Sequence, residues 1–177
     1  MDPFGQPLLQ PDQRSCGAAV VVVARLLHDA DYATYVDTPA RFEQETLAVH
    51  RRVTGVADAL GRSQLPWPQA LGTPPWAVAR ELSVITDTPY HSRLVLPTAR
   101  QRCLDSIEAA ADGGHEVALY VGNAWLPRHV VLVLDGNLTT YDPSCGRRVT
   151  FTRERFLGAH LSIAGWSHPW IAVLPER

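Results

Sequence analysis

The chain has 177 residues, 46% hydrophobic and 19% charged, which is typical of one globular domain and not of a disordered or fibrous chain. Its formal net charge of -2 and its two isolated arginine pairs, Arg51-Arg52 and Arg147-Arg148, predict no binding to nucleic acid or to an anionic membrane. All 16 basic residues are arginines, so Schiff-base chemistry on a lysine is excluded.

The first part of the chain begins with an arm and a strongly apolar helix. Residues 1–15 are polar and contain three prolines, which predicts an extended arm. Ser15 is a suitable N-cap for a helix from Cys16 to about His28. The apolar residues of this helix are continuous and not confined to one stripe, so we expect it to be buried. Its four consecutive valines would also suit a strand, but the flanking alanines and leucines favour a helix.

Further helical patterns surround a proline-rich passage over residues 65–75. Thr73 can cap the helix that follows this passage, and Gly113-Gly114 can end the last helix of this part of the chain. The predicted helices span residues 39–59, 75–84 and 98–111, and a short strand is predicted over residues 91–96.

The remainder of the chain changes from helical to strand-forming patterns. Asp135-Gly136-Asn137 suits a hairpin turn between two of the predicted strands. Helices followed by antiparallel strands predict an α+β protein. We expect a single domain over 1–177, mainly helical over 16–113 and an antiparallel sheet over 114–177. The predicted strands span residues 116–121, 128–134, 138–141, 147–151 and 171–174.

Segments that would place the protein in a membrane or a secretion route are not evident. The longest apolar stretch, residues 17–24, is about two helical turns, whereas roughly 20 residues are needed to cross a bilayer. Cys16, Cys103 and Cys145 have no metal-binding spacing and suggest free thiols in a reducing compartment. The sequence therefore predicts no metal, no cofactor, and a protein that is cytoplasmic or exported without a cleavable signal peptide.

Cys16 is the candidate nucleophile. A thiol in the first turn of a buried helix lies at the positive end of the helix dipole, which stabilises a thiolate. Gly17 would leave room for a substrate backbone to approach. A buried cysteine taken alone is more simply a small hydrophobic residue, but its place at the helix start favours a catalytic role.

His129 and Asp142 are the candidate base and its orienting carboxylate. His129 opens a strongly apolar strand just after the loop Trp125-Leu126-Pro127, and a strand end can hold an imidazole rigidly. Asp142 follows thirteen residues later, where the hairpin returns the chain beside the first strand. A carboxylate there would fix the tautomer of the imidazole and stabilise the imidazolium. The structural alternatives are an ordinary histidine at a strand end and an Asp-Pro turn.

Side-chain donors and aromatic residues complete the candidate site. Gln10 lies six residues before Cys16, and its amide with the Cys16 N–H would form an oxyanion hole, for which Gln13 is the competing candidate. We expect Trp125 and either Trp67 or Trp76 to line the substrate groove; the alternative is packing in a core, which the helix-start position favours for Trp76.

With these residues, the sequence resembles the papain superfamily of cysteine peptidases, and within it the leader peptidases of bacteriocin exporters and their stand-alone relatives. The resemblance rests on Gln10-x5-Cys16-Gly17, on His129 opening a strand, and on Tyr141-Asp142-Pro143 after a hairpin. It implies a papain-like fold with Cys16 as nucleophile, His129 as base, Asp142 as third member and Gln10 in the oxyanion hole. The passage over residues 39–72 is longer than in a minimal leader peptidase, and we expect no fused transporter, so cleavage after a double glycine is not carried over.

The sequence thus predicts a cysteine-dependent hydrolase that cleaves a peptide or isopeptide amide of a protein substrate through a thioester. One alternative is a papain-like effector that deamidates or transamidates glutamine of a partner protein, and another is a non-catalytic papain-like binding module. Cys145, close after Asp142, would be a bystander or a redox partner, and Cys103 would be structural. The sequence predicts no oligomeric state.

Overall fold

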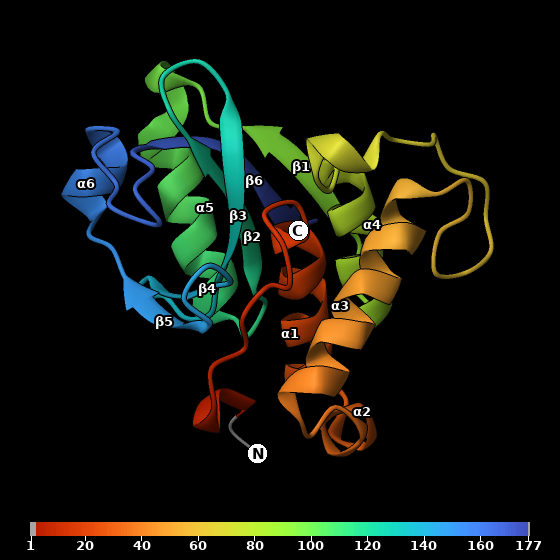
Figure 1. Ribbon diagram of the computed structural model, residues 1–177. Coiled ribbons are helices and arrows are strands. Elements are labelled where there is room, and N and C mark those ends of the chain that lie inside the picture. Colours follow the sequence, from red (N-terminus) through yellow and green to blue (C-terminus); the bar gives the residue numbers. More distant parts are fainter. Residues whose placement is uncertain (1–2, 177) are drawn as a thin grey trace.

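A computed structural model describes residues 3–176, and the predictions for residues 1, 2 and 177 lie outside that range. It is an α+β protein in which six antiparallel strands form one sheet between two groups of helices (Figure 1). The strand order is β1-β6-β2-β3-β4-β5, so the last strand is inserted between the first two. The strands are β1 Tyr90–Leu94, β2 Val117–Gly122, β3 Pro127–Val133, β4 Thr139–Asp142, β5 Arg147–Thr150 and β6 His168–Pro175.

The helices divide between the two faces of the sheet (Figure 1). Helix α1 packs on one face of the sheet, and α3 and α4 cover its outer side. Helices α5 and α6 cover the other face of the sheet. Short 3-10 turns connect several of these elements. The helices are α1 Cys16–His28, α2 Ala30–Tyr35, α3 Pro39–Thr54, α4 Pro75–Thr86, α5 Arg100–Asp112 and α6 Arg153–Leu157.

Alternation of side chains along the strands produces two hydrophobic cores. In β2, Ala118 and Tyr120 belong to the core around α1, whereas Val117, Leu119 and Val121 belong to the core around α5. All six residues of β2 are buried because both faces of the sheet are covered. This explains the continuous apolar runs of the central strands, which a sheet with one wet face would not need.

Helix α1 has the predicted bounds and the predicted burial, but its start is built differently from the prediction. Ser15 occupies the N-cap position, yet its side chain accepts no helix N–H. Instead, Asp12 Oδ1 accepts the N–H groups of Arg14 and Ser15 at 2.8 and 2.9 Å, which turns the chain into the helix. Helix α1 therefore has no side-chain cap, and a turn held by Asp12 leads into it.

Other boundaries also differ from the prediction. The helix predicted over residues 39–59 ends at Thr54, because Gly55 leaves the helical conformation. Thr73 does not cap α4, which has Pro74 at its N-cap position and no side-chain cap. Two short helices were not predicted, and each is capped by a preceding side chain, Asp29 for α2 and Thr152 for α6.

The N-terminal arm lies beside the sheet near β4, to which hydrogen bonds hold it (Figure 1). The N–H of Leu8 donates to Gly146 and the N–H of Gln10 donates to Pro143, while the Tyr141 hydroxyl donates to the Leu8 carbonyl at 2.6 Å. The predicted extended arm contains two turns, a 3-10 turn at Pro3–Gly5 and the turn at residues 11–14 that leads into α1. Within residues 3–176, no helix combines the length and apolar character that crossing a membrane requires.

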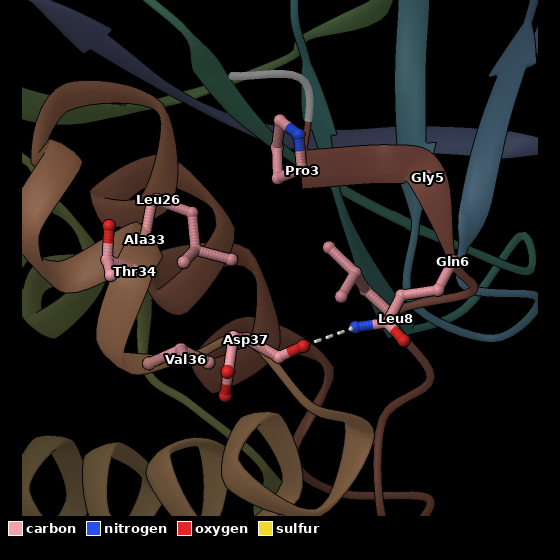
Figure 2. A pocket seen from close by; sticks show the side chains of 9 residues that line it. All are labelled: Pro3, Gly5, Gln6, Leu8, Leu26, Ala33, Thr34, Val36 and Asp37. Atoms are coloured by element: carbon pink, nitrogen blue, oxygen red, sulfur yellow. Dashed lines mark hydrogen bonds between the residues drawn. The ribbon is translucent and has the colours of Figure 1, made fainter.

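A cavity of about 410 Å³ lies between this arm and α2 (Figure 2). The Gln6 side-chain amide closes one side of it by donating to the Asp37 carbonyl at 3.2 Å. Leu8, Leu26 and Val36 give this cavity a largely apolar lining. It contains none of the predicted site residues.

Candidate active site

Cys16 is the first residue of α1 and is only 5% exposed. The Asp12 turn brings the chain to this point, and the Ser15 carbonyl accepts the first intrahelical hydrogen bond from Ala19 at 2.8 Å. The N–H groups of the first helical turn have no intrahelical acceptors, so they concentrate positive partial charge around the thiol.

His129 lies near the start of β3, next to an irregularity in the sheet. Val121 pairs with His129, but the next residue, Gly122, pairs with Pro127, so the register shifts at this point. Only glycine fits at position 122, because a Cβ there would lie 2.0 Å from the Leu126 carbonyl oxygen. The bulge and the tight loop therefore fix where β3 begins and where its histidine lies.

The β3–β4 hairpin brings His129 and Asp142 together. His129 Nε2 lies 2.7 Å from Asp142 Oδ1, and both side chains are buried. The same carboxylate oxygen accepts the N–H of Ser144 at 2.9 Å. Because Nε2 is engaged by Asp142, Nδ1 is the ring nitrogen that remains for the hydrogen bond between His129 and Cys16.

The electrostatics of this group favour the charged imidazole. Burial lowers the pKa of His129, but its hydrogen bonds with Asp142 and Cys16 outweigh burial and raise the pKa to about 9. Burial raises the pKa of Asp142, but the hydrogen bonds from His129 and Ser144 outweigh it and hold that pKa below its ordinary value. The pair is therefore an imidazolium and a carboxylate at neutral pH.

Cys16 and His129 line one cavity of about 370 Å³. One side of this cavity consists of residues 70–75, before and at the start of α4, and the other consists of residues 126–130, at the start of β3. Tyr120, from the middle of β2, also lines the cavity, and its hydroxyl donates to the Thr73 carbonyl at 2.8 Å. The cavity thus lies between the helical part of the chain and the sheet.

The two candidate glutamines occupy different places. Gln10 is half-buried, and its amide donates to the Asp12 carbonyl at 2.6 Å, while its Oε1 is buried and has no partner within residues 3–176. Gln13 is exposed and lines the cavity that holds Cys16. Of the two predicted donors, only Gln13 is thus among the residues that line the cavity.

Of the other three predicted site residues, Trp67 lines the cavity, whereas Trp125 and Gly17 do not. The space beside Gly17 is filled by Thr73, whose Cβ would lie 2.6 Å from a Cβ at position 17, so the missing side chain serves close packing. Trp67 lines the cavity and packs edge-on against Trp76, with ring centroids 5.1 Å apart. Trp125 is 82% exposed and does not line the cavity, whereas its neighbour Leu126 does.

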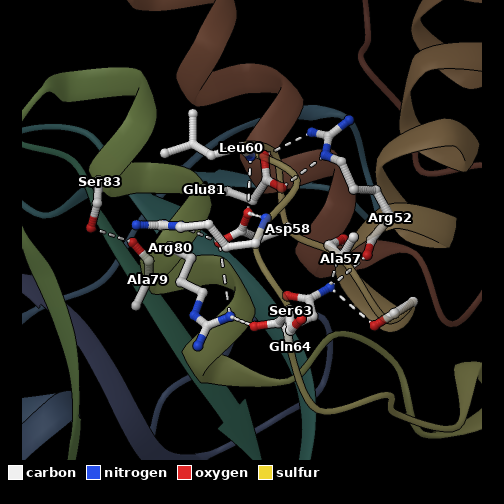
Figure 3. A network of polar contacts seen from close by, with 12 residues as sticks. Arg52, Ala57, Asp58, Leu60, Ser63, Gln64, Ala79, Arg80, Glu81 and Ser83 are labelled. Carbon is white, nitrogen blue, oxygen red and sulfur yellow. Dashed lines mark hydrogen bonds and ion pairs between the residues drawn. The ribbon is translucent and has the colours of Figure 1, made fainter.

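A polar network supports the loop that carries Trp67 (Figure 3). Arg52 of α3 makes two hydrogen bonds to the buried carboxylate of Glu81 in α4, at 2.9 and 2.7 Å. The Gln64 amide lies within hydrogen-bonding distance of three backbone carbonyls, including that of Arg52 at 2.7 Å. Asp58 accepts two backbone N–H groups inside the same loop. This network holds residues 55–73 against the two helices and so supports one side of the cavity.

Several cavity residues were missed by the sequence interpretation. Arg14 and Arg128 stand two residues before Cys16 and one before His129, so their nearness to both candidates could have been read from the sequence. Thr73 and Tyr120 carried no sequence signal, because long-range packing alone brings them to the site.

The remaining cysteines lie outside this arrangement. Cys145 is exposed, and its Sγ lies 3.6 Å from the Asp142 carbonyl oxygen. Cys103 of α5 is buried in the core on the other face of the sheet, where burial raises its pKa to about 11. In the described part of the chain, no three His, Cys, Asp or Glu side chains gather as a metal site would require.

The arrangement contains a thiol at a helix start, a histidine that contacts it, and a carboxylate that orients the histidine, all beside a cavity. These are the parts that nucleophilic acyl transfer requires. No protein-family model, no curated protein and no solved structure matches this chain.

Proposed function

We propose that this chain is a papain-like cysteine hydrolase that cleaves a peptide or isopeptide amide. The observation that carries the proposal is the meeting of Cys16, His129 and Asp142, from three separate elements, beside one cavity. A histidine that served only structure would need one partner. This imidazole instead bridges a carboxylate and a thiol, which are the two contacts of a catalytic base.

The papain-like assignment is supported by the order and placing of the elements. The candidate nucleophile begins a buried helix in the N-terminal part, and the candidate base and carboxylate lie on adjacent antiparallel strands in the C-terminal part. This is the arrangement that the resemblance of the sequence implies.

In the proposed reaction, the Cys16 thiolate attacks the amide carbonyl carbon and the carbonyl oxygen becomes an oxyanion. His129 then gives its Nδ1 proton to the amine nitrogen, the C–N bond breaks, and the acyl group stays on sulfur as a thioester. A water molecule, losing its proton to His129, attacks the thioester and releases a carboxylic acid and the thiolate. Asp142 keeps the imidazole oriented throughout.

The oxyanion needs donors near the first turn of α1. The Cys16 N–H has no intrahelical acceptor, and Gln13 lines the same cavity. Gln10 would have to release the Asp12 carbonyl before its amide could turn to a substrate. We therefore propose Gln13 as the side-chain donor in this arrangement, with Gln10 as the alternative.

The proposal is tested by the alkylation of the three cysteines with iodoacetamide, located by mass spectrometry. Exposure alone would make Cys145 react faster than the nearly buried Cys16. A thiolate held by an imidazolium would reverse that order at pH 6, where ordinary thiols are protonated. We expect Cys16 to react first in the native protein and to lose that advantage in His129→Ala, while Cys145 reacts equally in both.

Faster alkylation of Cys145 than of Cys16 in folded native protein would contradict the proposal and favour a binding module. If Cys16 does react first, incubation with protein substrates identifies the reaction, with Cys16→Ala as control. New peptide termini indicate hydrolysis, whereas conversion of a glutamine to glutamate without cleavage indicates deamidation.

A further inference from the structure

We infer that the cavity beside Cys16 selects substrates that carry a carboxylate close to the amide to be cleaved. This inference rests on the proposed function and names its substrate class. It comes from the charges that line the cavity, which the proposed reaction does not itself require.

Two arginines from different segments of the chain line the cavity of the candidate nucleophile. Arg14 precedes α1 and Arg128 is the second residue of β3, and both line the cavity that holds Cys16 and His129. Both are exposed, and neither guanidinium has a hydrogen bond or ion-pair partner within residues 3–176. Two cationic groups thus line the cavity with their guanidinium donors unused.

Among the residues that the structure describes, no acidic side chain lines this cavity to neutralise them. Asp142 is engaged with His129, and Asp12 Oδ1 accepts the backbone N–H groups of Arg14 and Ser15. In the proposed active form, the thiolate, the imidazolium and the Asp142 carboxylate together carry one negative charge. The two arginines therefore give the site a net positive charge of about one.

Two further polar groups of the cavity residues lack partners. Thr73 Oγ1 and Trp67 Nε1 are buried, and neither has a hydrogen-bond partner within the described residues. The indole nitrogen can only donate, and the hydroxyl can donate. A ligand rich in acceptor oxygens would match the guanidinium groups, and it would reach these two donors only by displacing the packing that buries them.

A carboxylate matches these requirements better than a neutral side chain. A guanidinium binds a carboxylate with two parallel hydrogen bonds, which gives orientation as well as attraction. The carboxylate could belong to an aspartate or glutamate side chain beside the scissile amide, or to the C-terminus of the substrate. Both sources present the same chemistry to Arg14 and Arg128.

The test compares an anionic and a neutral reagent of the same size. Alkylation of Cys16 by iodoacetate and by iodoacetamide is measured in the native protein, in Arg14→Gln, in Arg128→Gln and in the double variant. The ratio of the two rates at Cys16 is divided by the ratio at Cys145 in the same sample. Arg155→Gln, at an exposed arginine on α6 away from the cavity, is the matched control.

We expect the normalised ratio to fall about three-fold with each substitution, as for a unit charge about 6 Å away in water, and about ten-fold in the double variant. The ratio should stay constant in Arg155→Gln. An unchanged ratio in the double variant would overturn this inference and leave the proposed function standing. A Cys16 that fails to react even with neutral iodoacetamide would overturn the proposed function and this inference with it.

Two isomeric compounds distinguish the sources of the carboxylate. N-acetylglutamine has only a main-chain carboxylate, and the α-amide of N-acetylglutamate has only a side-chain carboxylate. Whichever isomer slows alkylation of Cys16 by iodoacetamide more strongly identifies the source. Equal slowing by the uncharged N-acetylglutamine amide would contradict the inference.

Discussion

At the scale of single residues, His129 is the group on which the proposed chemistry depends. Its imidazole is buried, which disfavours its charge, yet hydrogen bonds with Asp142 and Cys16 raise its pKa to about 9. The contacts therefore outweigh desolvation by a wide margin. Asp142 has two separable effects on this imidazole, since its charge stabilises the proton and its oxygen fixes the ring.

Replacing Asp142 separates these two effects. In Asp142→Asn the hydrogen-bond acceptor remains but the charge is lost, and in Asp142→Ala both are lost. We expect the pKa of His129, measured by NMR titration, to fall from about 9 toward its ordinary value in both variants. Alkylation of Cys16 at pH 6 should slow in the order native, Asn, Ala. An Ala variant that matches the Asn variant would show that orientation by Asp142 has no role.

At the scale of elements, the site depends on how closely the start of α1 packs on the segment before α4. Gly17 and Thr73 are in direct contact, and Tyr120 of β2 holds the Thr73 carbonyl. Helix, loop and strand thus meet at one point beside Cys16. The contact explains why glycine, a poor helix former, stands in the first turn of a long buried helix.

Gly17→Ala tests this packing. Helix propensity alone favours alanine by up to about 1 kcal/mol, but the new Cβ would lie 2.6 Å from the Thr73 Cβ. We expect a net loss of about 1–3 kcal/mol in the free energy of unfolding measured with urea, partly restored by adding Thr73→Gly. Gly5→Ala is the control, because a Cβ at that position would meet no atom within 4 Å. Equal stability of the two alanine variants would show that the loop yields without cost.

At the scale of the whole molecule, the sheet carries a core on each face and the ionised pair lies where its central strands end. The pair links global stability to pH. The pKa of His129 is higher in the folded than in the unfolded protein, so binding of its proton stabilises the fold. This stabilisation is complete below the unfolded pKa of about 6.5 and is lost as the pH rises through about 9. The pKa of Asp142 is lower in the folded protein, so its carboxylate stabilises the fold at neutral pH and this stabilisation is lost as the pH falls into the acid range.

The free energy of unfolding should therefore fall between pH 6.5 and pH 9 by about 3 kcal/mol through His129. Urea unfolding across this range, in the native protein and in His129→Ala, measures the contribution, which should vanish in the variant. His160→Ala, at an exposed histidine, is the control and should keep the native slope. Parallel pH profiles for native protein and His129→Ala would contradict the assigned pKa.

Much of the fold could be predicted because its signals are local. The apolar run after Ser15 predicted α1 with its observed bounds, and the order of helices first and strands later predicted an α+β protein with an antiparallel sheet. The hairpin turn after β3 predicted that Asp142 would return to His129, since sequence neighbours in a hairpin pair in space. Helix α3 ends at Thr54, earlier than predicted, because Gly55 adopts an extended backbone conformation although the sequence pattern beyond it also suited a helix.

The sequence by itself determined the longer helices and the main strands, the helix start at Cys16 and the His129–Asp142 pairing across a hairpin, because each depends on residues close together along the chain. Only the tertiary structure decided the insertion of β6 beside β2, the filling of the space at Gly17 by Thr73, and the gathering of Arg14 and Arg128 around one cavity. These features depend on which distant surfaces bury one another, and local periodicity carries no information about that choice.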